Sequence, residues 1–350
     1  MKNLARISFA LLALAAAFTT HAQAVKWHPG HYVKVDTSTG YDARPVIDEI
    51  AKEPAVKGVM LYFYWYQLEK SKGVYDFSKI DFYVNKLKTL PTPKRLVVHI
   101  KDRRPQSTLK TGIIPAYMLS DPIYKGGVAY QPQNNMVVAR LFNPAVMDRS
   151  IALFRALGTR YNSNPYIEGF ATGETTIGFG ADQSKWPSDY SKSALLNQWV
   201  RFARSARTTM PQTNLFINTN FVGGDANMAT LIQAIYESHV AAAGPSTIPN
   251  RFLSSQKVWT GATGADYRGL IAIGPGVESS VFDGQHGDFT PKQIGDWAYN
   301  PLRVTHLFWL RNTYKGDSTQ RWSTGILPYL RTNPPTRTAC PTTYGLCNTK

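Results

Sequence analysis

Short runs of apolar residues recur along the chain, separated by segments in which apolar residues follow helical spacing. Most of these runs lack strict alternation of apolar and polar positions, which is typical of parallel strands covered on both faces. The segments between them place apolar residues three or four positions apart, as one face of a helix requires. We predict strands at His31–Val35, Val59–Trp65, Leu96–Ile100, Ile167–Thr172, Leu215–Asn220, Leu270–Gly274 and Val304–Trp309.

Strands that alternate with helices predict parallel βαβ units. The longer helical segments include Ala226–Ala243, and an eighth strand is expected either between Phe252 and Thr260 or within Val277–Phe282. Eight strands would close a single (β/α)₈ barrel, an α/β fold that we assign to residues 25–335. An open doubly wound sheet is the alternative, but no glycine-rich phosphate loop follows the first strand.

The first 24 residues have the pattern of a secretory signal peptide. Lys2 and Arg6 precede a nearly continuous apolar run over 7–18, and residues 22–24, Ala-Gln-Ala, form a small-x-small cleavage site. The apolar run is shorter than the roughly 20 residues that span a bilayer. We therefore expect a mature chain that begins near Val25, has no membrane anchor and is secreted or periplasmic.

The chain is strongly basic. Its formal net charge of +16 falls to +14 in the mature chain, because the leader carries two basic residues and no acidic one. The basic residues are spread along the chain, so an anionic polysaccharide is one option for a partner. Nucleic acid is not expected, since charge without a binding motif is weak evidence. Oligomeric state is not indicated by the sequence.

Cys340 and Cys347 are the only cysteines. In an oxidising compartment we expect them to form a local disulfide in the C-terminal tail, residues 336–350. The sequence has no His-Glu-x-x-His helix, acidic calcium loop or Gly-x-Ser-x-Gly elbow. It therefore predicts neither a metal site nor a serine hydrolase.

Residues 58–87, GVMLYFYWYQLEKSKGVYDFSKIDFYVNKL, form the most informative segment. A strand ends in an aromatic cluster and is followed by Leu68-Glu69, a glycine turn and Tyr75-Asp76-Phe77 before a helix. This pattern resembles the second strand and helix of clan A glycoside hydrolases, the barrel superfamily of cellulases and β-galactosidases. The resemblance implies a (β/α)₈ fold that hydrolyses glycosidic bonds. Because the motif is largely structural, we expect Glu69 in a loop or salt bridge rather than in catalysis.

The segment 169–178, GFATGETTIG, passes from a buried strand directly into Gly173 and Glu174. A carboxylate at the carboxyl end of a barrel strand lies on the face where such barrels keep their active sites. In clan A the acid/base glutamate ends the fourth strand, and Glu174 ends the fourth strand predicted here. The clan usually has asparagine before that glutamate, whereas this chain has Gly173. We predict Glu174 as the acid/base.

Retaining glycosidases need a second carboxylate, about 5–5.5 Å from the first, as nucleophile. Clan A enzymes supply it from the end of the seventh strand. Our candidate is Glu278, which follows an apolar run and a Gly-Pro-Gly sequence, although its strand can also be counted as the sixth. The rival acids are Asp266, Asp283 and Asp288.

Further polar and aromatic side chains at strand ends are candidates for binding sugar. By resemblance to the eighth strand of clan A, Trp309 is expected to form the floor of the subsite next to the cleaved bond. The other predicted substrate-binding residues are Tyr64, Trp65, His99, Lys101 and Asn220.

The predicted function is cleavage of a polysaccharide or oligosaccharide by double displacement between two carboxylates, without a cofactor. A lyase acting on an acidic glycan is one alternative, and its products would carry a new C=C bond that absorbs in the ultraviolet. A non-catalytic glycan-binding barrel is the other, and it would release no reducing ends. The sequence names neither the sugar nor its linkage, nor endo or exo cleavage.

Overall fold

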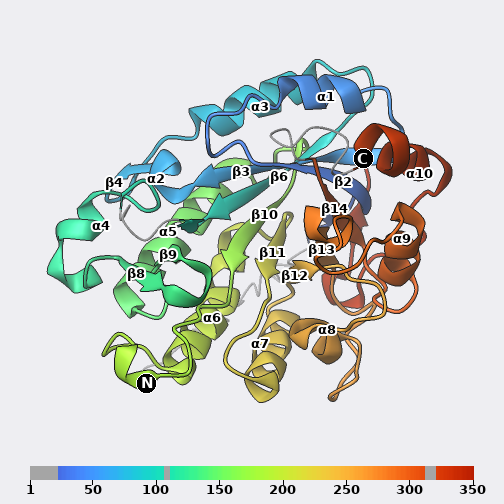
Figure 1. Cartoon of the computed structure of the whole chain (residues 1–350). Helices are drawn as coiled ribbons and strands as arrows, with labels where there is room; N and C mark the ends of the chain where they lie inside the picture. Colours follow the sequence, from blue (N-terminus) through green and yellow to red (C-terminus); the bar gives the residue numbers. More distant parts are fainter. Residues whose placement is uncertain (1–22, 106–110, 312–320) are drawn as a thin grey trace, which may run out of the picture.

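Eight parallel strands form a closed barrel in the computed structural model, which describes residues 23–105, 111–311 and 321–350 (Figure 1). Neighbouring barrel strands follow one another in the sequence, and the last pairs with the first. The predicted (β/α)₈ fold is therefore confirmed. The barrel strands are β2 (Gly30–Val35), β3 (Val56–Tyr64), β6 (Arg95–Lys101), β10 (Ile167–Glu174), β11 (Asn214–Asn218), β12 (Ala241–Ser246), β13 (Ile273–Val277) and β14 (His306–Leu310).

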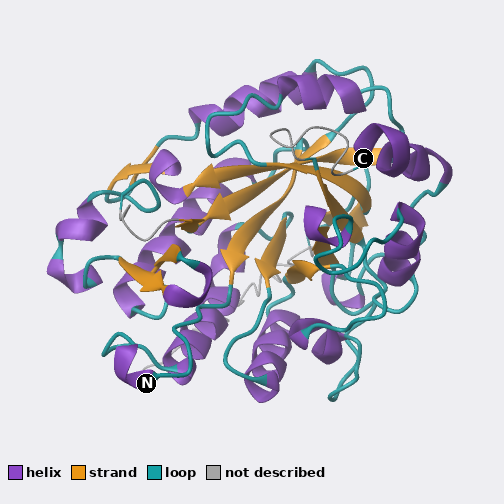
Figure 2. Ribbon diagram, in the orientation of Figure 1, coloured by secondary structure: helices purple, strands orange, loops and turns teal. Residues whose placement is uncertain are grey.

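Helices surround the barrel and cover its outer surface (Figure 2). They are α1 (Arg44–Ile50), α2 (Trp65–Leu68), α3 (Ser78–Lys88), α4 (Tyr117–Ser120), α5 (Pro144–Tyr161), α6 (Lys192–Ala206), α7 (Asp225–Glu237), α8 (Ser254–Trp259), α9 (Pro291–Tyr299) and α10 (Leu327–Thr332). The start of α5 shows how the sequence sets a boundary. The Asn143 side chain accepts hydrogen bonds from the backbone N–H groups of Ala145 and Val146, at 2.9 and 3.1 Å. Pro144 occupies the first helical position, where its missing N–H is not needed.

Side chains of the barrel strands alternate between two apolar layers. One layer fills the space between the barrel and the helices, and the other fills the barrel interior. On β14, Leu307 and Trp309 face the helices, whereas Phe308 points into the barrel. Because interior-facing and exterior-facing residues alternate along each strand, only every second side chain can reach the barrel mouth. On β14 this alternation decides that Phe308, and not Trp309, faces the barrel interior.

The sixth barrel strand, β12, was not predicted, and both positions predicted for an eighth strand are wrong. Its sequence, AAAGPS, contains no β-branched residue and begins inside the segment predicted as a helix, 226–243. Helix α7 ends at Glu237, before the predicted end of that helix. At the two positions predicted for the eighth strand, residues 254–259 form α8 and residues 279–281 form a 3₁₀ turn. Strand β12 is hydrogen-bonded to a neighbour on each side, so tertiary pairing overrides the helix propensity of alanine.

A three-stranded antiparallel sheet follows β6 and lies beside the barrel, near α4 (Figure 1). Its strands are β7 (Arg103–Pro105), β8 (Val128–Gln131) and β9 (Met136–Ala139). Strand β9 is central, and Arg103 of β7 pairs with Val138 of β9. This pairing holds the backbone of Arg103 close to the barrel mouth.

The 58–87 motif forms a strand, a short helix and a hairpin. The hairpin consists of β4 (Glu69–Ser71) and β5 (Val74–Tyr75), with the glycine turn between them. Glu69 is fully buried there and forms an ion pair with Arg149 of α5. The structural role predicted for Glu69 is therefore confirmed.

The two ends of the described chain meet at the amino-terminal end of the barrel. Strand β1 (Val25–Lys26) pairs in parallel with β15 (Cys347–Asn348). Cys340 and Cys347 form the predicted disulfide. The rings of Trp27 and Tyr344 pack edge to face, 5.8 Å apart, against the interior layer of the barrel. The tail thus covers this end of the barrel, while residues 1–22 of the predicted signal peptide lie outside the described residues.

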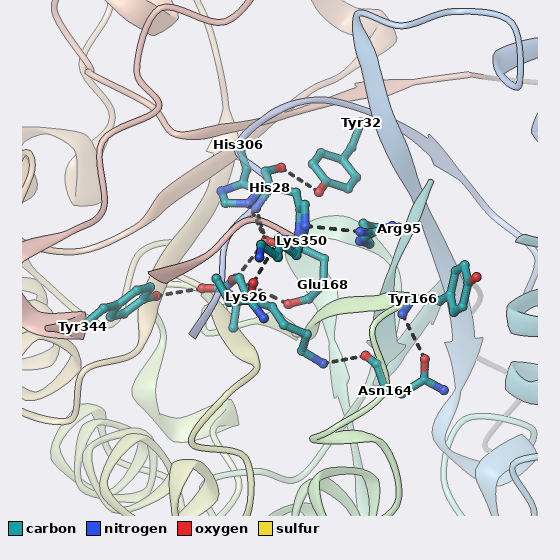
Figure 3. Close-up of polar contacts among 12 residues, drawn as sticks. Lys26, His28, Tyr32, Arg95, Asn164, Tyr166, Glu168, His306, Tyr344 and Lys350 are labelled. Carbon is teal, nitrogen blue, oxygen red and sulfur yellow. Dashed lines mark hydrogen bonds and ion pairs between the residues drawn. The ribbon is translucent and has the colours of Figure 1, made fainter. Parts of the chain in front are cut away.

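A buried polar cluster lies just inside the amino-terminal ends of the strands, with Glu168 of β10 at its centre (Figure 3). Nδ1 of His28 lies 2.7 Å from this carboxylate, and Nε2 of His306 lies 3.2 Å from it. Burial alone would raise the pKa of Glu168, but the hydrogen bonds from His28 and His306 hold it at about 2. Burial lowers the pKa of the neighbouring Lys26 ammonium to about 7, against the attraction of Glu168. The cluster therefore depends on an ionised Glu168.

Replacing Glu168 with glutamine is expected to lower the free energy of unfolding by about 3–5 kcal/mol at neutral pH, because its buried partners lose their counter-charge. The folded-state pKa is depressed from 4.5 to about 2, so the contribution is present above pH 4.5 and is lost as the pH falls towards 2. Urea denaturation at neutral and at acidic pH measures both effects. Glu237→Gln, on the exposed face of α7, is the control and should change stability by less than about 0.5 kcal/mol. Equal stability of Glu168→Gln and the wild type at neutral pH would contradict this role.

Candidate active site

A cavity of about 450 Å³ opens at the carboxyl ends of the barrel strands. This volume is within the usual range of small-ligand sites. Interior-facing side chains such as Met60, Tyr62 and Phe308 line it from within the barrel. The predicted site residues that line it are Glu174, Glu278, His99, Lys101 and Asn220.

Glu174 is the last residue of β10, the fourth barrel strand. Its side chain is 42% exposed and lines the cavity. Nη1 of Arg103 lies 3.4 Å from Oε2, and Nδ2 of Asn220 donates to the same oxygen at 3.4 Å. Among the described residues these contacts reach only Oε2, so Oε1 is available to a ligand. Arg103 also donates to the backbone carbonyl of Glu174, which fixes the end of the strand.

Glu278 directly follows β13, which the structure identifies as the seventh barrel strand. Its carboxylate forms an ion pair with Lys34 of β2, the first strand. Burial alone would lower the pKa of the Lys34 ammonium, but the charge of Glu278 holds it above its ordinary value. A Cβ atom at Gly276 would lie 3.2 Å from Nζ of Lys34, so the glycine leaves room for this pair. A buried positive charge therefore stands beside the carboxylate of Glu278.

The three rival acids lie elsewhere. Asp266 and Asp288 form ion pairs with arginines, at 2.6 and 2.8 Å. Asp283 accepts a hydrogen bond from a backbone N–H of its own loop. In the described part of the chain none of the three lines the cavity, whereas Glu278 lines it together with Glu174 and Asp102.

His99 lies in the wall of the cavity, and its ring packs against that of Tyr62 with 4.1 Å between centroids. Burial, together with the positive charges of Lys34 and Lys101, lowers the pKa of His99 to about 3. The ring is therefore neutral at ordinary pH. No hydrogen bond reaches it from the rest of the described chain, so one nitrogen can donate and the other can accept a hydrogen bond from a sugar hydroxyl.

Lys101 is the last residue of β6 and is already paired within the protein. Its Nζ lies 2.6 Å from Oδ2 of Asp36 and 5.0 Å from the centre of the Tyr64 ring. Tyr64 is largely buried and does not line the cavity, so its predicted role in binding sugar is contradicted. The chain turns into α2 directly after Tyr64, which carries the tyrosine beyond the cavity.

The two predicted tryptophans are also excluded from the cavity. Trp309 is fully buried between the barrel and the helices, where its Nε1 donates to Nδ1 of His31 at 3.1 Å. Trp65 lies in α2, and its indole N–H donates to Glu69 at 2.8 Å. Both predictions were wrong because an aromatic run shows neither where the strand ends, as for Trp65, nor which face each ring occupies, as for Trp309. On β14, Phe308 is the aromatic residue that lines the cavity.

Some cavity residues were not singled out in the sequence. Lys34 carried the clearest signal, since a lysine among the buried residues of a strand is uncommon and needs a partner. Arg251 and His286 come from loops after β12 and β13. Their sequence surroundings contain no pattern that would have marked them.

No group of three or more His, Cys, Asp or Glu side chains is placed to hold a metal ion within residues 23–105, 111–311 and 321–350. Over the same residues, no helix is long and apolar enough to cross a membrane.

Solved structures with the same arrangement of strands and helices include known glycosidases. The chain superposes on a β-galactosidase from Bacillus circulans sp. alkalophilus with a TM-score of 0.54 and 11% identity, over 81% of this chain and 50% of that one. It superposes on endo-glycoceramidase II from Rhodococcus sp. with a TM-score of 0.52 and 13% identity, over 82% of this chain and 75% of that one. The chain has the fold of these glycosidases.

The shared fold covers 81% of this chain, although the chain spans only half the length of the β-galactosidase. No protein-family model matches the sequence, and no curated protein is similar to it. The (β/α)₈ fold that the motifs' resemblance implies is thus confirmed.

Proposed function

We propose that the protein is a glycoside hydrolase that cleaves a polysaccharide or oligosaccharide with retention of configuration. The observation that carries this proposal is that Glu174, the last residue of the fourth barrel strand, and Glu278, directly after the seventh, line one cavity. Retaining glycosidases use two carboxylates that flank the scissile bond. The shared fold with a β-galactosidase and an endo-glycoceramidase supports a carbohydrate substrate.

In the proposed mechanism Glu174 holds a proton and donates it to the glycosidic oxygen as the leaving group departs. Glu278 attacks the anomeric carbon and forms a covalent glycosyl-enzyme. Glu174 then removes a proton from water, which attacks the same carbon and releases the sugar. Lys34 keeps Glu278 in place beside a positive charge, and neutral His99 binds a sugar hydroxyl. No cofactor takes part in these steps.

We also propose that the protein acts outside the cytoplasm, in a periplasm or as a secreted protein. The leader-like residues 1–24 and the Cys340–Cys347 disulfide support this location, since disulfides persist in oxidising compartments. Both neutral and acidic glycans are candidate substrates. Arg251 lines the cavity and has no acidic partner among the described residues, so it is available to bind an anionic group of a substrate. Acidic polymers are therefore included in the test.

The test is to incubate the purified protein with a panel of neutral and acidic polysaccharides while reducing ends and ultraviolet absorbance are measured together. New reducing ends without new absorbance support hydrolysis. New absorbance indicates a lyase, and binding without either product indicates a non-catalytic barrel. Proton NMR of the first sugar released then shows whether the anomeric configuration is retained.

A further inference from the structure

Gly173, which precedes Glu174, lies directly against the carboxylate of Asp102. A Cβ atom at position 173 would lie 2.7 Å from Oδ2 of Asp102 and closer still to its other carboxyl atoms. Asp102 follows β6, lines the cavity and has a side chain that is only 7% exposed. The absence of a side chain at position 173 therefore makes room for a third carboxylate beside the proposed acid/base.

Arg103 connects the two acidic side chains. Its Nε donates to Oδ1 of Asp102 at 3.0 Å, and its Nη1 lies 3.4 Å from Oε2 of Glu174. The same guanidinium donates to the backbone carbonyl of Thr176 at 3.1 Å. Burial alone would lower the pKa of Arg103, but the charges of Asp102 and Glu174 raise it. Arg103 is thus a fixed cation that two carboxyl groups share.

We propose that Asp102 is a positioning residue that offsets the charge of Arg103 and so allows Glu174 to hold the proton it donates. This inference rests on the function proposed above. A guanidinium beside a carboxyl group favours its ionised form, whereas a general acid must be protonated at the working pH. Asp102 competes with Glu174 for the positive charge of Arg103. The absence of a side chain at Gly173 leaves space for the Asp102 carboxylate beside this guanidinium.

The other charges around Glu174 are already balanced or do not contact it. Lys34 pairs with Glu278, and Lys101 pairs with Asp36. Within the described part of the chain, Arg103 is the charged residue that pairs with the Glu174 side chain. The remaining titratable groups that line the cavity are Tyr62, His99, Arg251 and His286. The test therefore alters the Asp102–Arg103 ion pair.

The test compares Asp102→Asn with the wild type, because asparagine keeps an oxygen for Arg103 and loses only the charge. Carbon-13 NMR titration of the Glu174 carboxyl, assigned from its absence in Glu174→Gln, needs no substrate. We expect the titration midpoint of this carboxyl to fall by about one pH unit or more in Asp102→Asn. If a hydrolysed glycan is found, the pH at which kcat falls on the alkaline side should be lower in Asp102→Asn by the same amount as the midpoint. At pH values above this fall, kcat should be roughly tenfold below the wild type, with little change in KM.

Gly173→Ala should lower the midpoint as well, since its methyl group displaces Asp102 from Arg103. This second variant replaces Asp102→Asn in the comparison if circular dichroism shows that the latter is unfolded. The matched control is Asp189→Asn, which removes a mostly buried carboxylate from Arg140 outside the cavity and should leave the midpoint unchanged.

An unchanged midpoint in folded Asp102→Asn overturns this inference even if hydrolysis depends on Glu174. A lowered midpoint in a protein that hydrolyses no glycan supports the charge coupling and refutes the proposed function instead.

Discussion

Replacing Glu174 with glutamine is expected to lower kcat by about 10³-fold on natural glycans, because the amide cannot donate the proton that the leaving oxygen needs. Glutamine has nearly the same size and keeps an oxygen for the 3.4 Å contacts with Arg103 and Asn220, so the fold and glycan binding should persist. Steady-state kinetics and isothermal titration calorimetry on the substrate found in the panel measure the two effects.

An aryl glycoside with an acidic phenol as leaving group provides the internal comparison for Glu174. Such a phenol departs without protonation, so formation of the glycosyl-enzyme should be much less affected than with a sugar leaving group. Asp283→Asn, which changes a rival acid that does not itself line the cavity, should retain wild-type kcat. Full activity of Glu174→Gln on the natural glycan would remove this residue from the mechanism.

Replacing Glu278 with alanine is expected to lower kcat on the order of 10⁴-fold or more, since the group that bonds to the anomeric carbon is lost. Sodium azide should restore part of the turnover, because azide enters the space of the carboxylate and attacks the same carbon. The product would be a glycosyl azide whose anomeric configuration is inverted, which proton NMR identifies.

Alanine also leaves the buried Lys34 ammonium without its carboxylate, so folding has to be checked separately. Glu278→Gln keeps an acceptor for Lys34 and should fold like the wild type by circular dichroism while remaining inactive. If both Glu278 variants are folded and turn over at the wild-type rate, another residue must be the nucleophile.

The positions of the two carboxylates along the chain followed from the apolar pattern. A continuous apolar run predicts a strand buried on both faces, and an acid placed directly after it lies at one end of the sheet. Glu174 and Glu278 met this condition in the sequence, and both line the cavity of the folded protein. Strand β12 was missed in the sequence, because its alanines bury little surface and favour a helix. Its identity as a strand depends on hydrogen bonds to β11 and β13, which no local sequence property records.

The face on which each side chain lies was less predictable. Phe308 and Trp309 are adjacent and both aromatic, yet Phe308 lines the cavity while Trp309 packs against the helices. A shift of one residue in register exchanges the two faces of a strand, and strand pairing across the barrel sets that register. The sequence therefore predicted that aromatic residues end this strand, but not which of them a ligand can reach.

By itself, the sequence determined the alternation of strands and helices, the (β/α)₈ class, the disulfide and the acidic residues that end two strands. These features depend on local spacing, on composition or on neighbours along the chain. The tertiary structure alone decided the pairing of Lys34 with Glu278, the fit of Asp102 against Gly173 and the exclusion of Trp309 from the cavity. Each of these joins residues from different strands or loops, and closure of the barrel is what brings them into contact.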